Sequence, residues 1–181
     1  MRKVRTVEMK RLTVDEFRKA EKLPLVVVLD NVRSMHNVGS VFRTADAFRA
    51  EAVCLCGITG IPPHPEIHKT ALGAEDSVSW HHFATASEAV GHLHANGYLV
   101  IAVEQVEHST KLQRFQAVGG EKYAIVVGNE VKGVCQEVVD LCDGCLEIPQ
   151  LGTKHSLNVS VATGIVVYEF ARQLLLQRIN I

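Results

Sequence analysis

Short runs of apolar residues punctuate the chain and predict its strands. The four clearest runs are LVVVLD (25–30), EAVCLCG (51–57), YLVIAVE (98–104) and YAIVVGN (123–129). Each is too short for a helix and almost continuously apolar, which is typical of strands buried on both faces of a parallel sheet. Two weaker candidates are SVSWHHF (77–83) and CLEIPQ (145–150).

Segments with helical spacing lie between these strands. In segment 37–48 the apolar positions recur with the 3.6-residue period of a helix, and Asn37 is a residue type that favours the N-cap. Nearer the N-terminus, Thr13 and Glu16 form a capping-box pattern that predicts a short helix over about 14–22. The remaining helical segments are about 65–72, 87–97, 110–116, 135–142 and 156–178.

The alternation of strands and helices predicts the fold class. It indicates an α/β domain with a mostly parallel sheet, helices on both faces and right-handed crossovers. Ligands of such domains bind beyond the carboxyl ends of the strands. A chain of 181 residues is long enough for one such domain with a substantial core. We therefore expect a basic N-terminal extension with its short helix over 1–24 and a single α/β domain over 25–181.

The closing helical segment predicts an interface. From Leu157 to Ala171 it is apolar nearly all round, whereas a helix that covers one side of a sheet needs only one apolar stripe. A second copy of the chain could cover the other side, so we predict a homodimer. The alternative is that the N-terminal helix of the same chain packs there.

Charge is distributed unevenly along the chain. Residues 1–22 carry a net charge of +4 and the remainder −5, within a total of −1. The basic N-terminal arm, which includes Arg2, Lys3 and Arg5, is therefore a candidate for binding a polyanion. The alternative is a solvated tail that binds nothing.

Composition limits the compartment and the class of protein. No apolar run reaches the roughly 18 residues of a membrane span, and no apolar segment follows the basic start as it would in a secretory signal. We expect a cytoplasmic protein without a membrane partner, in which the five cysteines are reduced thiols. Cys135, Cys142 and Cys145 contain a single C-x-x-C, and the histidines form no H-E-x-x-H, so no metal site is predicted.

Two known nucleotide-binding fingerprints are missing from the sequence. No G-x-G-x-x-G follows a predicted strand, and GNEVKGV (128–134) has P-loop glycine spacing but Val134 in place of the lysine. The segment still places glycines and polar side chains just past a buried strand. It is either a binding loop at the ligand edge of the sheet or a glycine-assisted turn.

Two polar residues do not fit their helices. Arg43 lies one turn after Gly39, whose missing side chain should leave that face open near an anion-favouring helix N-terminus. The alternative is that Arg43 pairs with Asp30 or Asp46 on a solvated surface. Asn158 is expected one turn inside the closing helix, with Ser156 as a plausible cap, and such an asparagine needs a hydrogen-bond partner.

Three segments together resemble the SpoU/TrmH branch of the SPOUT RNA methyltransferases. The family motif N-x-G-x-x-x-R-T-A matches 37–45, G-N/S-E-x-x-G matches 128–133, and I-P followed by S-L-N-V-S-V-A matches 148–149 and 156–162. The resemblance covers about residues 25–175 and includes KTALGAE (69–75). One departure is Ser34-Met35, which stands where many members carry Asp-Pro.

The resemblance implies a fold, an activity and a set of site residues. It implies a C-terminal trefoil knot, a homodimer, S-adenosylmethionine as methyl donor, and methylation of a ribose 2′-hydroxyl in tRNA or rRNA rather than DNA. The implied catalytic residues are Asn37, Arg43, Glu130, Ser156 and Asn158. The implied donor-binding residues are Gly128, Asn129, Glu130, Gly133, Ile148, Pro149, Leu151, Leu157 and Asn158. The candidate RNA-binding residues are Arg2, Lys3, Arg5, Arg33, Arg43 and Lys69.

Two other classes of function stay open at this point. The chain could be a catalytically idle RNA-binding relative of these enzymes. It could also be a flavodoxin-like ligand-binding module unrelated to RNA, in which Arg43 and Asn158 have structural partners.

Overall fold

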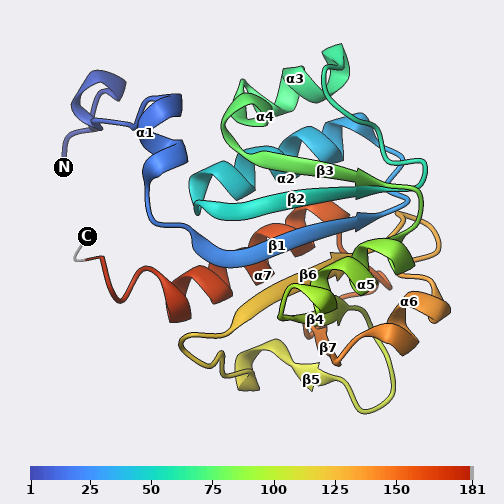
Figure 1. The fold of residues 1–181 in the computed structure, drawn as a ribbon. Coiled ribbons are helices and arrows are strands. Elements are labelled where there is room, and N and C mark those ends of the chain that lie inside the picture. Colours follow the sequence, from blue (N-terminus) through green and yellow to red (C-terminus); the bar gives the residue numbers. More distant parts are fainter. Residues whose placement is uncertain (180–181) are drawn as a thin grey trace.

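One parallel sheet of seven strands organises the molecule (Figure 1). The computed structural model describes residues 1–179, and the strand order is β3-β2-β1-β6-β4-β7-β5, with every pairing parallel. The strands are β1 (Leu23–Asp30), β2 (Ala50–Cys56), β3 (Ser79–Phe83), β4 (Tyr98–Val103), β5 (Thr110–Lys111), β6 (Lys122–Val127) and β7 (Gly144–Glu147). The six predicted strands are confirmed. Segment 110–116, predicted as helical, instead holds β5 and the 3-10 turn η2 (Leu112–Arg114).

Helices cover both faces of the sheet, as predicted. One face carries α2 (Met35–Ala47), α3 (Pro65–Ala71), α4 (Ala74–Ser77) and α7 (Val159–Leu174), and the other carries α5 (Ala86–Ala95) and α6 (Gln136–Leu141). Side chains of β1 alternate between two cores: Leu25, Val27 and Leu29 face the first, while Val26 and Val28 face the second. Burial on both faces explains why β1 is apolar without interruption.

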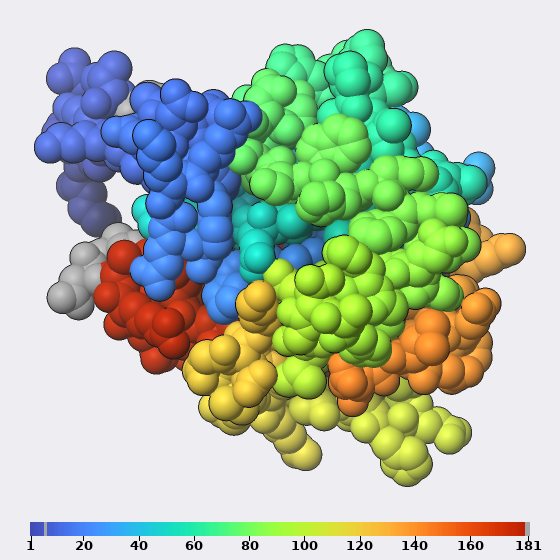
Figure 2. Space-filling model, viewed as in Figure 1, coloured from blue at the N-terminus to red at the C-terminus, as the bar shows by residue number. Residues whose placement is uncertain are grey.

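The N-terminal segment begins as the sequence predicts but leaves the helix early. Both bonds of the capping box form, since Thr13 Oγ1 accepts from the Glu16 amide and Glu16 accepts from the Thr13 amide. The helix α1 (Val14–Lys19) ends before the predicted residue 22 because Ala20 turns to extended backbone that leads into β1. Before it lies the 3-10 turn η1 (Thr6–Glu8). Figure 2 shows this N-terminal segment standing out from the body.

Helix α7 buries one side and exposes another. Val166, Val167 and Phe170 are fully buried. Three apolar residues of α7 are exposed, Val161, Ile165 and Tyr168, and so is Leu157 just before the helix; these four are called here the α7 stripe. Helix α1 packs instead against α4, where Arg18 Nη2 donates to the Asp76 carbonyl at 3.0 Å. The alternative in which the N-terminal helix covers the α7 stripe is therefore wrong.

The strand order brings four loops to one edge of the sheet. The neighbouring strands β1, β6, β4 and β7 all end there, and the loops that follow them meet at their carboxyl ends (Figure 1). This is the edge at which open α/β sheets bind ligands. The trefoil knot is not tested by this topology and stays a prediction. No helix within residues 1–179 is long and apolar enough to cross a membrane.

Candidate functional site

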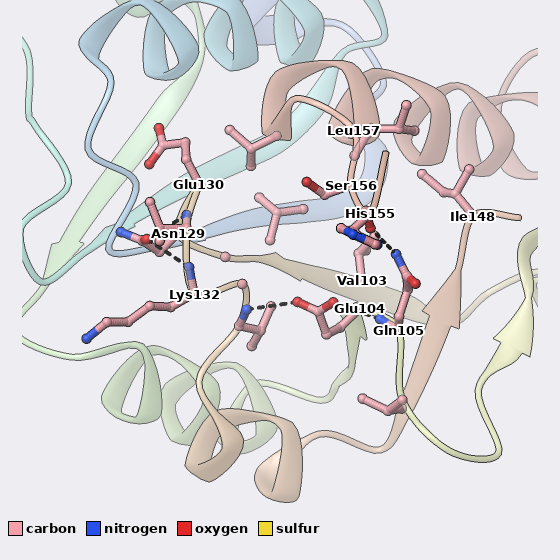
Figure 3. A pocket seen from close by; sticks show the side chains of 18 of the residues that line it. Val103, Glu104, Gln105, Asn129, Glu130, Lys132, Ile148, His155, Ser156 and Leu157 are labelled. Carbon is pink, nitrogen blue, oxygen red and sulfur yellow. Dashed lines mark hydrogen bonds between the residues drawn. The ribbon is translucent and has the colours of Figure 1, made fainter. Parts of the chain in front are cut away.

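A cavity of about 610 Å³ opens at the carboxyl edge of the sheet. Figure 3 shows its walls, which come from the end of β4, the loop after β6 and the segment that leads into α7. The lining mixes valine, leucine and isoleucine side chains with amides and carboxylates. This combination suits a small ligand that has both apolar and polar parts.

The loop after β6 folds tightly back on itself. Asn129 and Gly133 exchange two backbone hydrogen bonds of 3.0 and 2.9 Å, while the Asn129 side chain accepts from the amides of Val131 and Lys132. A Cβ on Gly128 would lie 2.0 Å from the Gly133 carbonyl carbon. Only glycine permits this close approach of two backbone segments, so the glycines of the second motif are required by the shape of the loop.

Glu130 ties this loop to the loop after β1. Its carboxylate accepts from the backbone amides of Arg33 and Ser34, both at 3.0 Å, and from Asn37 Nδ2 at 2.9 Å. Burial by itself would raise the pKa of Glu130, but these three donors outweigh it and lower the pKa below its usual value of 4.5. The carboxylate is therefore charged at neutral pH and acts as a fixed acceptor.

Asn37 and Asn158 extend the same network across to α7. Asn158 Nδ2 donates to Asn37 Oδ1 at 3.1 Å, and Asn158 Oδ1 accepts from the amides of Ser160 and Val161. Asn158 is thus the N-cap of α7, so its predicted place inside the helix, with Ser156 as cap, is wrong. Ser156 instead lines the cavity. The expectation that Asn158 needs a partner is confirmed.

The start of α2 also differs from the prediction. Ser34 is the N-cap, its hydroxyl accepting from the Asn37 amide at 3.3 Å, and the helix begins at Met35. Asn37 therefore lies in the first turn, where its side chain is free to join Glu130 and Asn158. Ser34, part of the departure from the family motif, thus has a defined capping role.

Arg43 lies further along α2 and lines a second cavity of about 390 Å³. This cavity is formed by Arg43 together with Ser40, Thr44, Ala47, Phe48, Lys69 and Thr70. Within residues 1–179 Arg43 is exposed and makes no ion pair. The predicted alternative pairing is wrong, because Asp30 accepts from Asn31 and the Cys135 amide, and Asp46 accepts from Ser77.

Gly39 serves a packing role rather than leaving a face open. A Cβ there would lie 2.2 Å from the Ile67 carbonyl oxygen and from Thr70 Oγ1. The glycine lets α2 and α3 approach each other, so the predicted open face over which Arg43 lies is wrong. The surface available to Arg43 is the second cavity instead.

The other predicted site residues divide between the cavity and the surface. Ile148 and Leu157 line the first cavity, whereas Pro149 is not among its lining residues and Leu151 is fully exposed. Lys69 pairs with Glu66 at 2.5 Å. In the arm, Arg2 and Arg5 pair with Glu8 at 3.1 and 3.2 Å, and Lys3 is exposed.

The sequence reading missed part of the cavity lining. Glu104, Gln105 and His155 all line it, and Figure 3 places Glu104 and Gln105 at the end of β4. For Glu104 and Gln105 the signal was their position directly after a buried strand, because such residues reach the ligand edge of a parallel sheet.

Metal-binding groups do not gather in the described part of the chain. Among residues 1–179 no three His, Cys, Asp or Glu side chains are placed to hold a metal ion. Burial raises the pKa of the Cys54 and Cys142 thiols to about 12, so both thiols stay protonated at neutral pH.

Comparison with known proteins places this geometry in a family. The sequence model of the SpoU rRNA Methylase family matches residues 24–168. The chain belongs to the SpoU family. The resemblance seen in the three motifs is thereby confirmed. Residues of the second and third motifs line the cavity, and Asn37 of the first motif bonds to Glu130 and Asn158 beside it.

Individual relatives extend the comparison. A 23S rRNA (guanosine-2′-O-)-methyltransferase of Coxiella burnetii is 33% identical over 157 residues, which cover 87% of this chain and 62% of that relative. An AdoMet-bound rRNA methyltransferase from Sinorhizobium meliloti matches with a TM-score of 0.78 at 28% identity, covering 88% of this chain and 60% of that one. A structure concerned with the 2-OH methylation of C/U34 on tRNA matches with a TM-score of 0.72 at 26% identity. The match covers 82% of this chain and 95% of that one. The chain spans less than two thirds of the length of the first curated relatives it matches.

Proposed function

We propose that this SpoU-family chain uses S-adenosylmethionine to methylate a ribose 2′-hydroxyl in tRNA or rRNA. The observation that carries the proposal is the hydrogen-bonded set Asn37, Glu130 and Asn158, which joins one residue from each of the three motifs beside the cavity. The names of the relatives support the same activity, since one is a 23S rRNA (guanosine-2′-O-)-methyltransferase and another was solved with AdoMet bound.

The cavity fits the proposed methyl donor. Its volume of about 610 Å³ lies within the range of about 300–1,000 Å³ for small-molecule sites. Gly128 and Gly133 bring backbone close to the cavity, and Ile148 and Leu157 add apolar surface. These residues, with Asn129, would hold the donor, and Pro149 and Leu151 flank them in the chain. S-adenosylmethionine supplies, when bound, a methyl group on a positively charged sulfur.

Arg43 is the proposed stabiliser of the reacting oxygen. A ribose hydroxyl is a weak nucleophile, and its attack requires that the oxygen be oriented and its growing negative charge stabilised. An arginine cannot serve as the base at neutral pH, but its planar guanidinium can hold an oxygen or a neighbouring phosphate. Arg43 is exposed and makes no ion pair within residues 1–179, so its charge is available to a substrate. Asn37, Glu130, Ser156 and Asn158 shape the site into which that oxygen must enter.

A homodimer explains how Arg43 reaches a donor cavity. At one end of the α7 stripe, Leu157 lines the donor cavity. At the other end, Tyr168 contacts Phe48, which lines the Arg43 cavity, with ring centroids 5.8 Å apart. Antiparallel pairing of two stripes about a twofold axis sets each donor cavity beside the partner subunit's Arg43.

The dimer has its own test. A charge placed in the middle of the stripe by Val161→Asp should produce a monomer in light scattering and remove methyl transfer, because a buried unpaired carboxylate is costly. Val118→Asp, an exposed valine in a loop outside the stripe, is the matched control and should remain dimeric. A dimeric Val161→Asp protein would contradict this interface.

Donor titration and methyl transfer together test the proposed function. Calorimetry should detect binding of S-adenosylmethionine, and labelled donor should modify unmodified total RNA. The tRNA fraction is the first to examine, because this chain covers 95% of the matched chain from the C/U34 structure. A substrate with one 2′-deoxy target nucleotide should bind but accept no methyl, since only RNA offers the 2′-hydroxyl.

Each contrary result has a distinct meaning. Absence of donor binding would favour the flavodoxin-like module. Donor and RNA binding without transfer would indicate the idle relative. Methylation of the 2′-deoxy substrate would show that the methyl acceptor is a base atom and not the ribose 2′-hydroxyl.

A further inference from the structure

Side chains link the loops around the donor cavity into a series. Glu130 joins the loop after β6 to the loop after β1, and Asn158 joins the start of α7 to Asn37 at the start of α2. These links all use residues of the three motifs. They do not link the end of β4 to its two neighbours, the loop after β6 and the segment before α7.

Glu104 makes the first of those connections. Its Oε2 accepts from the Val134 amide at 3.1 Å, and its Oε1 accepts from the Gln105 amide at 2.8 Å. Gly133, with a φ of +68°, lies so close that a Cβ there would be 2.1 Å from Glu104 Oε2. The carboxylate is therefore pressed against the loop after β6 and holds its last residues by a charge-assisted hydrogen bond.

Gln105 makes the second connection. Its Nε2 donates to the His155 carbonyl at 2.8 Å, across 50 residues of chain. His155 belongs to the segment between β7 and α7, which lines the cavity and is exposed over residues 151–158. Figure 3 shows both connections leaving the end of β4 in different directions. The dipeptide Glu104-Gln105 thus bonds both to the loop after β6 and to the segment before α7.

We propose that Glu104 and Gln105 are positioning residues. They complete the series of links around the cavity and hold the loop after β6 and the segment between β7 and α7 in shape for the methyl donor. The proposal rests on the proposed function, because it takes the cavity to be the donor site. Exposed loops open at low free-energy cost, and a ligand that must order them binds more weakly. Links that order the loops beforehand lower that cost. Neither residue lies in the three motifs, so the role is inferred from the hydrogen bonds of Glu104 and Gln105 in this structure.

The two links should differ in strength. Loss of a hydrogen bond to a charged group weakens binding by about 10- to 100-fold, and loss of a neutral one by about 3- to 10-fold. Glu104→Ala should therefore raise the Kd for S-adenosylmethionine more than Gln105→Ala does. Glu104→Gln keeps one oxygen that can accept from the Val134 amide but turns its amide nitrogen toward the Gln105 amide, so it should recover only part of the affinity. The loss should appear mainly as a higher KM for S-adenosylmethionine, and a merely structural role would lower kcat and raise the KM for RNA as well.

Limited trypsin digestion provides a second readout that needs no donor. Lys132 lies in the loop held by Glu104, and Lys154 lies in the segment held by Gln105; both are exposed. Glu104→Ala should speed cleavage at Lys132, and Gln105→Ala should speed cleavage at Lys154, each without affecting the other site. Glu107→Ala and Gln113→Ala, exposed neighbours outside the cavity lining, are the matched controls and should resemble wild type.

The outcomes separate this proposal from the proposed function. Donor binding by the wild-type protein decides whether the cavity is a donor site. Where wild type binds, an unchanged Kd in both Glu104→Ala and Gln105→Ala would overturn the positioning role. Equal acceleration of cleavage at both lysines by either variant would also overturn it, because it would mean general loosening instead of separate links.

Discussion

The two cavities of this chain are built in opposite ways. The proposed donor cavity is surrounded by side chains that already bond to one another, and Glu130 alone accepts three hydrogen bonds. Around the Arg43 cavity, the hydroxyl groups of Ser40, Thr44 and Thr70 donate to backbone carbonyls rather than to other side chains of the lining. Arg43 itself makes no ion pair within residues 1–179. The first region is organised before any ligand arrives, and the second keeps its charge available.

This difference assigns each cavity a part of the proposed reaction. A small donor gains affinity from a site that is ordered in advance. A polyanionic RNA brings its own charges to an unpaired guanidinium, so the Arg43 region needs little internal bonding. Substitutions in the two regions should therefore separate donor binding from transfer.

The largest effect is expected from Gly128→Ala. The added Cβ would lie 2.0–2.2 Å from backbone atoms of Gly133 and Val134, which cannot move without opening the loop. Calorimetry should show no binding of S-adenosylmethionine, and methyl transfer should be undetectable. Gly91→Ala, where nothing lies within 4 Å of the new Cβ, should behave as wild type. Normal donor affinity in Gly128→Ala would exclude this loop from the donor site.

Arg43→Ala should break transfer and spare donor binding. Removal of one group that stabilises a developing oxyanion lowers kcat by about 100- to 1,000-fold. The Kd for the donor should remain within a few-fold, since Arg43 does not line the donor cavity. Arg43→Lys should also fail, because a point charge does not replace the planar fork. Arg114→Ala, an exposed arginine elsewhere, is the control, and near-normal turnover in Arg43→Ala would reject the role.

Glu130→Gln should cause a smaller loss with a defined pH dependence. Its amide nitrogen would face donors that need an acceptor, so methyl transfer should fall about tenfold. The folded-state pKa of Glu130 is lowered, so its contribution to stability is present above about pH 4.5 and is lost as the pH falls through the lowered value. Urea unfolding between pH 7 and pH 3 should show this loss in wild type but not in Glu130→Gln. Identical pH profiles would mean that the carboxylate charge contributes nothing to the link.

The smallest effect is expected from the N-terminal arm. Glu8 already pairs with Arg2 and Arg5, which leaves Lys3, Lys10 and Arg11 as the arm's remaining basic residues. Deletion of residues 2–11 should leave the capping box of α1 intact, weaken RNA binding a few-fold and reduce the slope of affinity against salt by about 1 to 3. An unchanged salt slope would show that the arm does not touch RNA.

The strands were predictable because they depend on local pattern. Burial on both faces leaves a continuous apolar run, and the capping box of α1 lies within four residues, so neither needs knowledge of distant contacts. The motifs also indicated that Asn37, Glu130 and Asn158 belong together. Their hydrogen bonds span 93 and 121 residues, which periodicity alone could not reveal.

What the sequence did not reveal depends on tertiary contacts. Ser34 and Asn37 are both good caps, and the choice followed from Glu130, which holds Asn37 in the first turn. The sequence around Gly39 would be the same whether a ligand or α3 occupied the space beside it, so the contact with α3 could not be predicted. Glu104 could be placed at the ligand edge, but its partner was fixed by the pairing of β4 with β6.

A mixed-dimer experiment tests the central claim, that the donor cavity of one copy works with the partner subunit's Arg43. Arg43→Ala and Gly128→Ala proteins, each expected to be inactive, are unfolded together, refolded and assayed for methyl transfer. If the site is shared, a heterodimer has one complete site, and random pairing should restore about a quarter of wild-type activity. If Arg43 serves the cavity of its own chain, every site contains a defect. The mixture would then stay as inactive as its components, and the shared site would be contradicted.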